Sequence, residues 1–140
     1  MVESTQEAGK KEEAGSEFLP RKMTGQDQAV MQTSNDALTT KVYAESLGYF
    51  KDEYCALFAR GKKKMMPIIN RGTWTRVHSV RQVLLRFLKA NAEVNQKVNV
   101  VSLGAGYDST IFWLRQHHGA TAETLDYVEI DFPDVIKKKL

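Results

Sequence analysis

The chain has 140 residues, of which 42% are hydrophobic and 26% are charged, and its formal net charge is +3 at pH 7. This composition is ordinary for one globular domain, and the weak positive charge permits nucleic-acid contact without arguing for it. The single cysteine, Cys55, excludes an internal disulfide framework and a cysteine-rich zinc site. Neither a long apolar stretch nor a secretory signal pattern is visible, so we expect a soluble cytoplasmic protein without a membrane partner.

Composition and periodicity divide the chain into three regions. Residues 1–24 contain few large apolar side chains, so we expect a disordered tail. Residues 25–97 are predicted to be an N-terminal helical region. Its first helix shows apolar residues at three- and four-residue spacings, with Asn35 or Asp36 as the N-cap and Gly48 as the C-terminal stop.

Two further helices are predicted in this region. A short helix spans about residues 53–59, and an exposed connection over 61–67 follows it. The clearest helix spans about residues 73–89, with Arg76 and Arg81 outside its apolar stripe. The stripe consists of Val77, Val80, Leu84, Phe87 and Leu88.

Residues 98–140 have the pattern of a βαβ unit, the start of a parallel α/β sheet. A β-branched run over 98–103 predicts the first strand, which ends in a Gly-Ala-Gly turn. Asp108 is placed to cap a helix that extends to about His117. A second strand is expected over 125–132, with alternate side chains on opposite faces of the sheet.

The glycine turn after the first strand is the main candidate for a ligand site. Glycines there allow close approach of the backbone, and the following helix presents free N–H groups. A dinucleotide fingerprint would require a third glycine where Ser109 stands. A nucleoside ligand without a pyrophosphate, such as S-adenosylmethionine, therefore fits better. A tight turn without a ligand is the alternative.

Charged side chains near this turn provide candidate ligand contacts. Asp131, at the carboxyl end of the second strand, is suited to accept hydrogen bonds from a ribose diol. Arg71 and Arg76, with Lys41 as a second source of positive charge, are suited to bind a carboxylate. Solvated surface positions are the alternative for each of these residues.

The remaining polar features indicate no further site. His117 and His118 have no partners at metal-ligand spacing, so no metal site is predicted. The lysine runs at 62–64 and 137–139 are expected to be solvated faces. No aromatic residues are interleaved with them, so we expect no nucleic-acid partner.

Several motifs together resemble the leucine carboxyl methyltransferase family over roughly residues 26–140. The glycine turn and the second strand carry the most specific of them. The motif segments are residues 35–38, 41–50, 69–72, 102–109 and 127–134.

The resemblance implies a Rossmann-like class I fold that uses S-adenosylmethionine as cofactor. It implies that Lys41 and Arg76 hold the methionine carboxylate, that Gly104 contributes a backbone contact, and that Asp131 binds the ribose. Family members methylate the C-terminal leucine carboxylate of the protein phosphatase 2A catalytic subunit, which is the implied partner. The tRNA wybutosine carboxyl methyltransferases share the Gly-Ala-Gly motif and are an alternative assignment.

The resemblance also implies more strands than residues 98–140 provide. We therefore expect an N-terminal portion of a longer enzyme, with little activity alone and with substrate-binding residues beyond Leu140. No catalytic residue is assigned. A non-catalytic remnant of the family is the second alternative.

Overall fold

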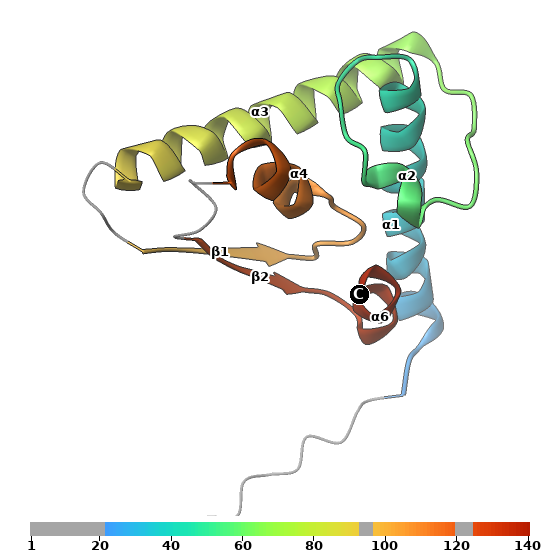
Figure 1. Cartoon of the computed structure of the whole chain (residues 1–140). Helices are drawn as coiled ribbons and strands as arrows, with labels where there is room; N and C mark the ends of the chain where they lie inside the picture. The colour runs from blue at the N-terminus through green and yellow to red at the C-terminus, as the bar shows by residue number, and fades with distance from the viewer. Residues whose placement is uncertain (1–21, 93–96, 120–124) are drawn as a thin grey trace, which may run out of the picture.

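The computed structural model describes residues 22–92, 97–119 and 125–140, and within them a small sheet flanked by helices (Figure 1). Most of the expected tail lies outside the described residues. The elements in chain order are α1 (Gly25–Ser46), α2 (Cys55–Phe58), α3 (Pro67–Ala92), β1 (Val98–Leu103), α4 (Thr110–His117), β2 (Leu125–Ile130) and α6 (Pro133–Lys139). No helix in these ranges is both long and apolar enough to span a membrane.

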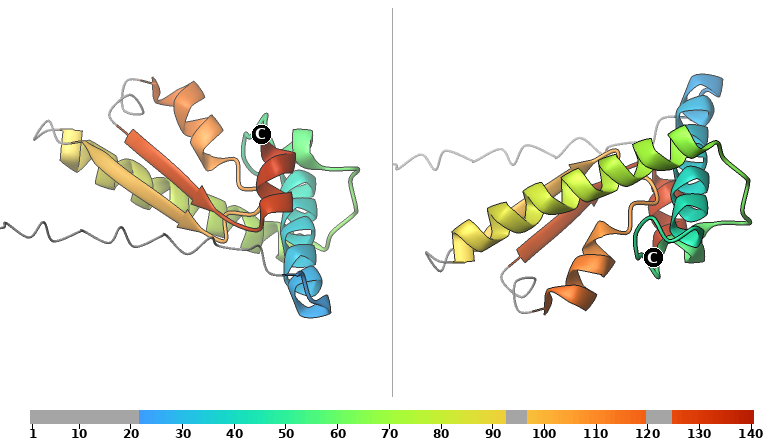
Figure 2. Two further views of the ribbon diagram at one scale, coloured as in Figure 1. Left: turned by 90° about the horizontal axis from the view of Figure 1, so that it is seen from below. Right: turned by 90° about the horizontal axis from the view of Figure 1, so that it is seen from above.

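The two strands form a parallel pair, as the βαβ pattern predicts. Val98 pairs with Leu125 at one end of the register and Leu103 with Ile130 at the other. The ladder continues into the turn, where the Gly104 N–H donates to the Ile130 carbonyl at 2.8 Å. Both strands point their carboxyl ends toward α1, which crosses that end of the sheet (Figures 1 and 2).

The expected start of the first helix is wrong. Helix α1 begins at Gly25 and is capped by Thr24, whose side chain accepts from the Asp27 N–H while the Asp27 carboxylate accepts from the Thr24 N–H. This reciprocal capping box satisfies two backbone donors, so the helix begins well before its apolar stripe. Asn35 and Asp36 therefore lie within the helix. The expected stop is confirmed, because Gly48 follows the helix with a φ of +78°.

The long helix begins earlier than its apolar stripe predicts. Helix α3 starts at Pro67, a residue whose fixed φ and missing N–H suit the first helical position. Its stripe is only partly buried, since Val80 and Phe87 are 53% and 48% exposed. Arg81, predicted to lie outside the stripe, is instead buried at 6% exposure. The core-facing side of α3 is thus more polar than its periodicity indicates.

Two apolar clusters hold the elements together. One joins α1, α2 and α6 through residues that include Val42, Cys55 and Val135. The other joins α3, both strands and α4 through residues that include Leu88 and Leu114. Helices α3 and α4 lie on the same face of the sheet, as the views from below and above show (Figure 2).

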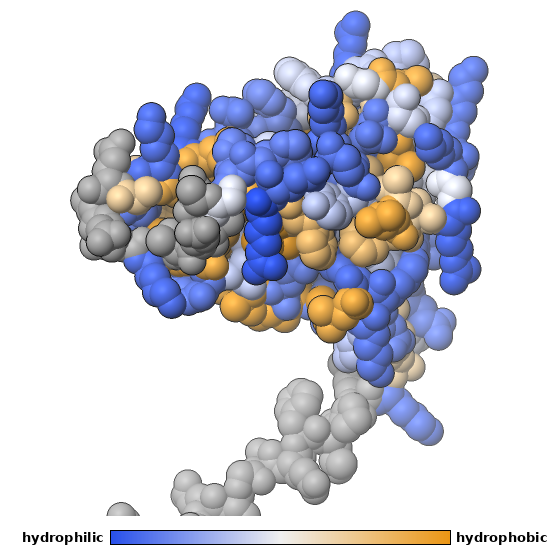
Figure 3. Space-filling model, viewed as in Figure 1, coloured by the Kyte–Doolittle hydropathy of each residue, from blue (hydrophilic) through white to orange (hydrophobic). Residues whose placement is uncertain are grey.

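The opposite face of the sheet is apolar and uncovered within the described residues. Val101, Leu103, Val128 and Ile130 are each about half exposed or more. Apolar side chains are visible along the lower margin of the molecule in Figure 3, on the side where Figure 1 places the strands. The fold is that of a mixed α/β unit with a two-stranded parallel sheet, which is compatible with the expected fold class.

The expectation that both lysine runs are solvated is wrong for one residue of the C-terminal helix α6. Lys139 is not solvated: its side chain is 3% exposed, and its Nζ lies 2.6 Å from Glu129 Oε1. The carboxylate of β2 thus pairs with a lysine on α6 and fixes that helix beside the strand. The run at 62–64 is exposed, as expected.

Candidate functional site

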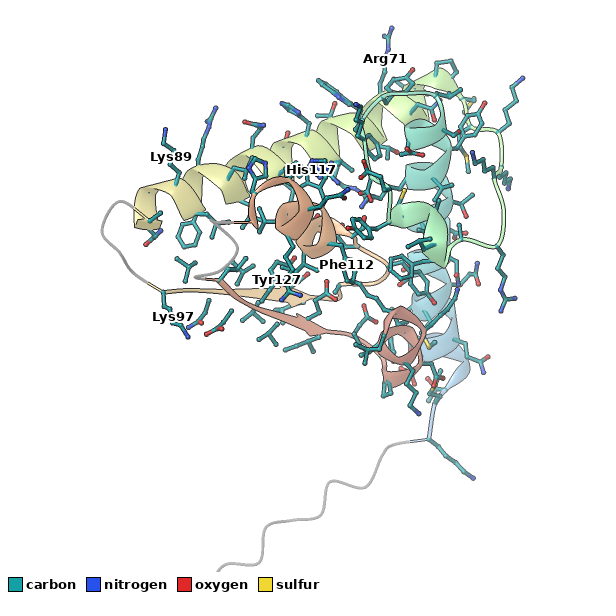
Figure 4. The ribbon with its side chains drawn as sticks, in the orientation of Figure 1. Arg71, Lys89, Lys97, Phe112, His117 and Tyr127 are labelled. Carbon is teal, nitrogen blue, oxygen red and sulfur yellow. The ribbon has the colours of Figure 1, made fainter. Side chains whose placement is uncertain are left out.

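A cavity of about 360 Å³ lies beside the turn that follows β1, and residues of α1 and α3 line its other sides. Its charged lining comes from Lys41 on α1, Arg76 on α3 and Asp108 in the turn before α4. Gly104 and Tyr127 of β2 also line it, and Figure 4 places Tyr127 between the sheet and the helices. Ligands of open α/β sheets bind at this carboxyl edge. The structure thus brings together Lys41, Arg76 and Gly104.

The glycine turn has the conformation that its residues predict. Gly104 and Gly106 have φ values of +63° and +52°, in the left-handed region that side chains with a Cβ adopt rarely. A Cβ on Gly106 would lie 3.2 Å from Ser34 Oγ, whereas a Cβ on Gly104 would meet no atom within 4 Å. The turn therefore packs against α1 at Gly106 and leaves the Gly104 backbone open to the cavity.

Lys41 reaches the cavity from a buried position. Its residue exposure is only 5%, and three acceptors surround its Nζ. Asp52 Oδ2 lies at 3.0 Å, Asp108 Oδ1 at 3.3 Å, and Ser109 Oγ accepts a hydrogen bond. The charge of Lys41 is thus shared with two carboxylates of the chain.

Asp52 is the most contacted of these groups. Its Oδ2 accepts from Arg81 Nη2 and from Ser109 Oγ, both at 2.7 Å, in addition to its ion pair with Lys41. Its Oδ1 accepts from the Cys55 N–H at 3.0 Å, at the start of α2. The side chain is fully buried. A buried carboxylate is stable only when it is paired and hydrogen-bonded in this way.

The ionisation of the site follows from these contacts. Burial acts to raise the pKa of Asp52, but the charge of Lys41 and the hydrogen bond from Ser109 outweigh it and hold the pKa below its ordinary value. Burial also acts to raise the pKa of Asp108, but the charge of Lys41 and local hydrogen bonds outweigh it, so this pKa is likewise below its ordinary value. Burial and the nearby Asp108 charge raise the pKa of Tyr127 to about 12, so its phenol is neutral at pH 7.

The two candidate arginines have different positions. Arg76 is exposed and lines the cavity. Arg71 lies near the start of α3 and projects outward from the molecule (Figure 4), and it does not line the cavity. Of the predicted pair, only Arg76 is therefore placed to contact a ligand there.

Asp131 lies next to the cavity and is not part of its lining. Its Oδ2 accepts from the Gly106 N–H at 2.6 Å, and its Oδ1 accepts from the Phe132 N–H at 2.7 Å. The carboxylate thus ties the end of β2 to the glycine turn. Both oxygens have a backbone donor, so any ribose contact would use their remaining acceptor capacity.

Two important residues of the site have no signal in the local sequence pattern. Asp52 lies in a short loop between α1 and α2, and Arg81 was placed outside the apolar stripe of α3. They are 29 positions apart, and only the tertiary fold makes them partners. Asp52 stands between Lys51 and Glu53, and Arg81 is followed by Gln82, so the neighbouring residues do not mark either position as buried.

Within the described ranges, no group of three or more His, Cys, Asp or Glu side chains is placed to hold a metal ion. His117 lies near Glu53, with 3.6 Å between its Nε2 and the carboxylate. Cys55 is buried, and burial with the adjacent Asp52 charge raises the pKa of its thiol to about 12, which makes it unreactive.

Comparison with known proteins decides the family. A model of the leucine carboxyl methyltransferase family matches residues 29–140. The chain belongs to the leucine carboxyl methyltransferase family. The matched segment contains Lys41, Arg76, Gly104 and Asp131, so every predicted contact residue lies within it.

Individual relatives cover most of the chain. A leucine carboxyl methyltransferase 1 homolog of Arabidopsis thaliana is 38% identical over 111 residues, which are 79% of this chain and 32% of the relative. Leucine carboxyl methyltransferase 1 of Bos taurus is 38% identical over 115 residues, 81% of this chain and 33% of the relative. The tRNA wybutosine-synthesizing protein 4 of Candida albicans is 36% identical over 124 residues, 85% of this chain and 18% of the relative. The chain thus spans about a third or less of these relatives.

Proposed function

We propose that this chain contributes the part of an S-adenosylmethionine site that holds the methionine carboxylate and the ribose. The reaction it serves is methyl transfer to the α-carboxylate of the C-terminal leucine of the protein phosphatase 2A catalytic subunit. One observation carries the proposal. Lys41 and Arg76, on two different helices, line one cavity beside the glycine turn.

The side chains of the cavity fit the charged end of such a cofactor. A carboxylate entering it would meet Arg76, whose planar donors suit carboxylate geometry, and Lys41. Asp108 is the acceptor of Lys41 that a ligand carboxylate could replace, because its side chain is 37% exposed and its contact of 3.3 Å is the longest of the three. Gly104 leaves the backbone open beside this point.

The chemistry requires little from ionisable groups of the chain. The bound cofactor would supply an electrophilic methyl group on a sulfonium. The carboxylate to be methylated has a reference pKa of about 3.3–3.7, so it is ionised near neutral pH and needs no strong base. The contribution of the protein would be alignment of the two reactants and exclusion of water, which can supply roughly 7–11 kcal/mol. Lys41, Arg76 and Asp131 would serve this alignment by fixing the cofactor.

The substrate assignment is supported by the names of the relatives. Both the Arabidopsis thaliana and the Bos taurus relatives are named for leucine carboxyl methylation. The Candida albicans relative, which is named for tRNA wybutosine synthesis, is similar to the same degree, since it is 36% identical over 85% of this chain, so tRNA is the competing substrate. The lysine run at 62–64 is exposed on the connection before α3 and does not line the cavity.

Two measurements test the proposal. Calorimetry of the chain with S-adenosylhomocysteine tests the cofactor site, and we expect binding that is lost in Arg76→Ala. Transfer of a labelled methyl group tests the substrate, with the intact phosphatase catalytic subunit compared with one that lacks its C-terminal leucine and with tRNA. Absence of binding, or labelling that does not depend on the terminal leucine, would contradict the proposal.

A further inference from the structure

A buried cluster of charges forms one wall of the cavity, and Asp52 lies at its centre. We define the Asp52 cluster as Lys41, Asp52, Arg81, Asp108 and Ser109. Asp52 itself does not line the cavity, but it contacts three other members of the cluster through its Oδ2. These members come from α1, from α3 and from the turn before α4.

The charge balance of the cluster depends on how Asp52 is shared. A lysine paired with one carboxylate alone would be neutralised and would attract an anion weakly. Here the same oxygen also accepts from Arg81 Nη2 at 2.7 Å, so two cations share one carboxylate. The Lys41–Asp52–Arg81 group therefore has one excess positive charge, which Asp108 balances at 3.3 Å from Lys41 Nζ and which a ligand carboxylate that replaces Asp108 would balance in its place. Arg81 is held in turn by the Lys51 carbonyl at 3.0 Å and by the Trp113 ring, whose centroid is 4.1 Å from its Cζ.

We propose that Asp52 is a positioning residue, which holds the Lys41 ammonium group where it can receive the carboxylate of the ligand. This inference rests on the proposed function and assigns a role to a residue that does not contact the ligand. Asp52 acts through Lys41: it anchors Nζ at 3.0 Å from the buried side, and Ser109 bridges the two groups. Asp108 then remains the exchangeable partner on the cavity side.

A purely structural role for Asp52 would have a different signature. Its Oδ1 accepts from the Cys55 N–H and its Oδ2 from Arg81, so Asp52 also stabilises α2 and the packing of α3. Loss of those contacts alone would lower the fraction of folded protein. The apparent affinity for every ligand would then fall by the same factor, because it scales with the fraction that is competent to bind. The ratio of two affinities is unaffected by that factor.

The test therefore compares two ligands by calorimetry on the complete chain. One is S-adenosylhomocysteine, and the other is its decarboxylated analogue, which keeps the ammonium group and the nucleoside and lacks only the carboxylate. In Asp52→Asn an amide replaces the carboxylate that three donors share, and Lys41 is drawn to Asp108. We expect the preference for the carboxylate-bearing ligand to fall by about tenfold or more, the value of one charge-assisted hydrogen bond.

Three further variants make the test specific. Ser109→Ala removes only the bridging hydroxyl, so we expect a smaller fall in the same ratio. Lys41→Met lowers the preference to the level that Arg76 alone provides, and adding Asp52→Asn to it has no further effect on the ratio. Glu129→Gln is the matched control, because it removes the carboxylate partner of another buried lysine, Lys139, outside the cavity, and it leaves the ratio unchanged.

The outcomes separate this inference from the function on which it rests. Failure of the wild-type chain to bind S-adenosylhomocysteine overturns the proposed function, and the inference with it. Normal wild-type binding with an unchanged or higher ratio in Asp52→Asn overturns the inference alone. A fall in the ratio that persists in the Lys41→Met background, or that Glu129→Gln reproduces, shows that Asp52 does not act through Lys41.

Discussion

Replacement of Asp131 tests how the end of β2 supports the site. In Asp131→Ala the Gly106 N–H loses an acceptor at 2.6 Å, and the Phe132 N–H loses one at 2.7 Å. The turn that carries Gly104 then keeps its backbone hydrogen bonds to Ile130 and loses the side-chain link to the second strand at Gly106. Gly106 has a φ of +52° and no Cβ to restrict its backbone, so contacts such as this hydrogen bond are needed to hold one conformation.

The magnitude follows from the single bond that links Asp131 to the turn. A hydrogen bond to a charged acceptor contributes about 1.5–3 kcal/mol. If that energy is lost from the ligand complex, the affinity for S-adenosylhomocysteine falls by roughly 10- to 150-fold. Calorimetry measures the affinity, and circular dichroism confirms that the variant is folded.

A matched control is available on the same strand. Asp126 is a strand carboxylate whose side chain is 61% exposed, and it forms only a loose pair with Lys97 at 3.7 Å. Asp126→Ala is therefore expected to leave the affinity unchanged. If folded Asp131→Ala binds as tightly as Asp126→Ala, then Asp131 supports neither the turn nor the ligand.

Three further predictions concern the rest of the chain. The pKa values of Asp52 and Asp108 are lowered in the folded chain, so both groups stabilise the fold at pH values above their ordinary pKa of about 3.9. This contribution is lost as the pH falls below about 4. We therefore expect the urea concentration at the unfolding midpoint to decrease there, and to decrease less in Asp52→Asn. Val98 is 6% exposed, so Val98→Thr should lower the unfolding free energy by about 1–3 kcal/mol. Val101 is 55% exposed, so Val101→Thr should change it by no more than about 0.5 kcal/mol. Equal changes would show that both faces of the sheet are buried. Cys55, with a thiol pKa of about 12, should resist alkylation at pH 8 until urea unfolds the chain, as mass spectrometry would show.

The strands and the turn could be predicted because their signals are local. A β-branched run that ends in glycines marks both β1 and the change in backbone direction after it. The alternation in β2 correctly separated the half-buried Tyr127 and Glu129 from Val128 and Ile130. The same pattern did not indicate that Val128 and Ile130 would be exposed, because exposure depends on what covers the sheet.

The helix starts could not be taken from the apolar pattern alone. A capping box and a proline at the first position are local signals as well, but they precede the stripes that identify the helices. Thr24 with Asp27 starts α1 about three turns before the expected position, and Pro67 starts α3 about two turns before it. In both helices the first turns are mostly exposed, so backbone capping sets the boundary there.

The Asp52 cluster could not be predicted because its pairings are long-range. Lys41 and Ser109 are 68 positions apart, and Ser109 and Asp52 are 57 positions apart. Periodicity treats a charged residue as an outward-facing one, which is correct for Arg71 and wrong for Arg81. Only a partner of opposite charge makes the burial of Arg81 tolerable, and that partner lies on another element.

These pairings also determine where the energetic cost of the site falls. Desolvation of Lys41 and Asp52 occurs when the chain folds, because both are already buried and paired beside the cavity. A ligand carboxylate would therefore have to displace only Asp108, the most exposed acceptor. Preorganisation of this kind reduces the cost of binding and transfers it to folding. Substitutions in the Asp52 cluster should consequently lower the stability of the chain for every ligand state, and should alter ligand preference only where they move Lys41.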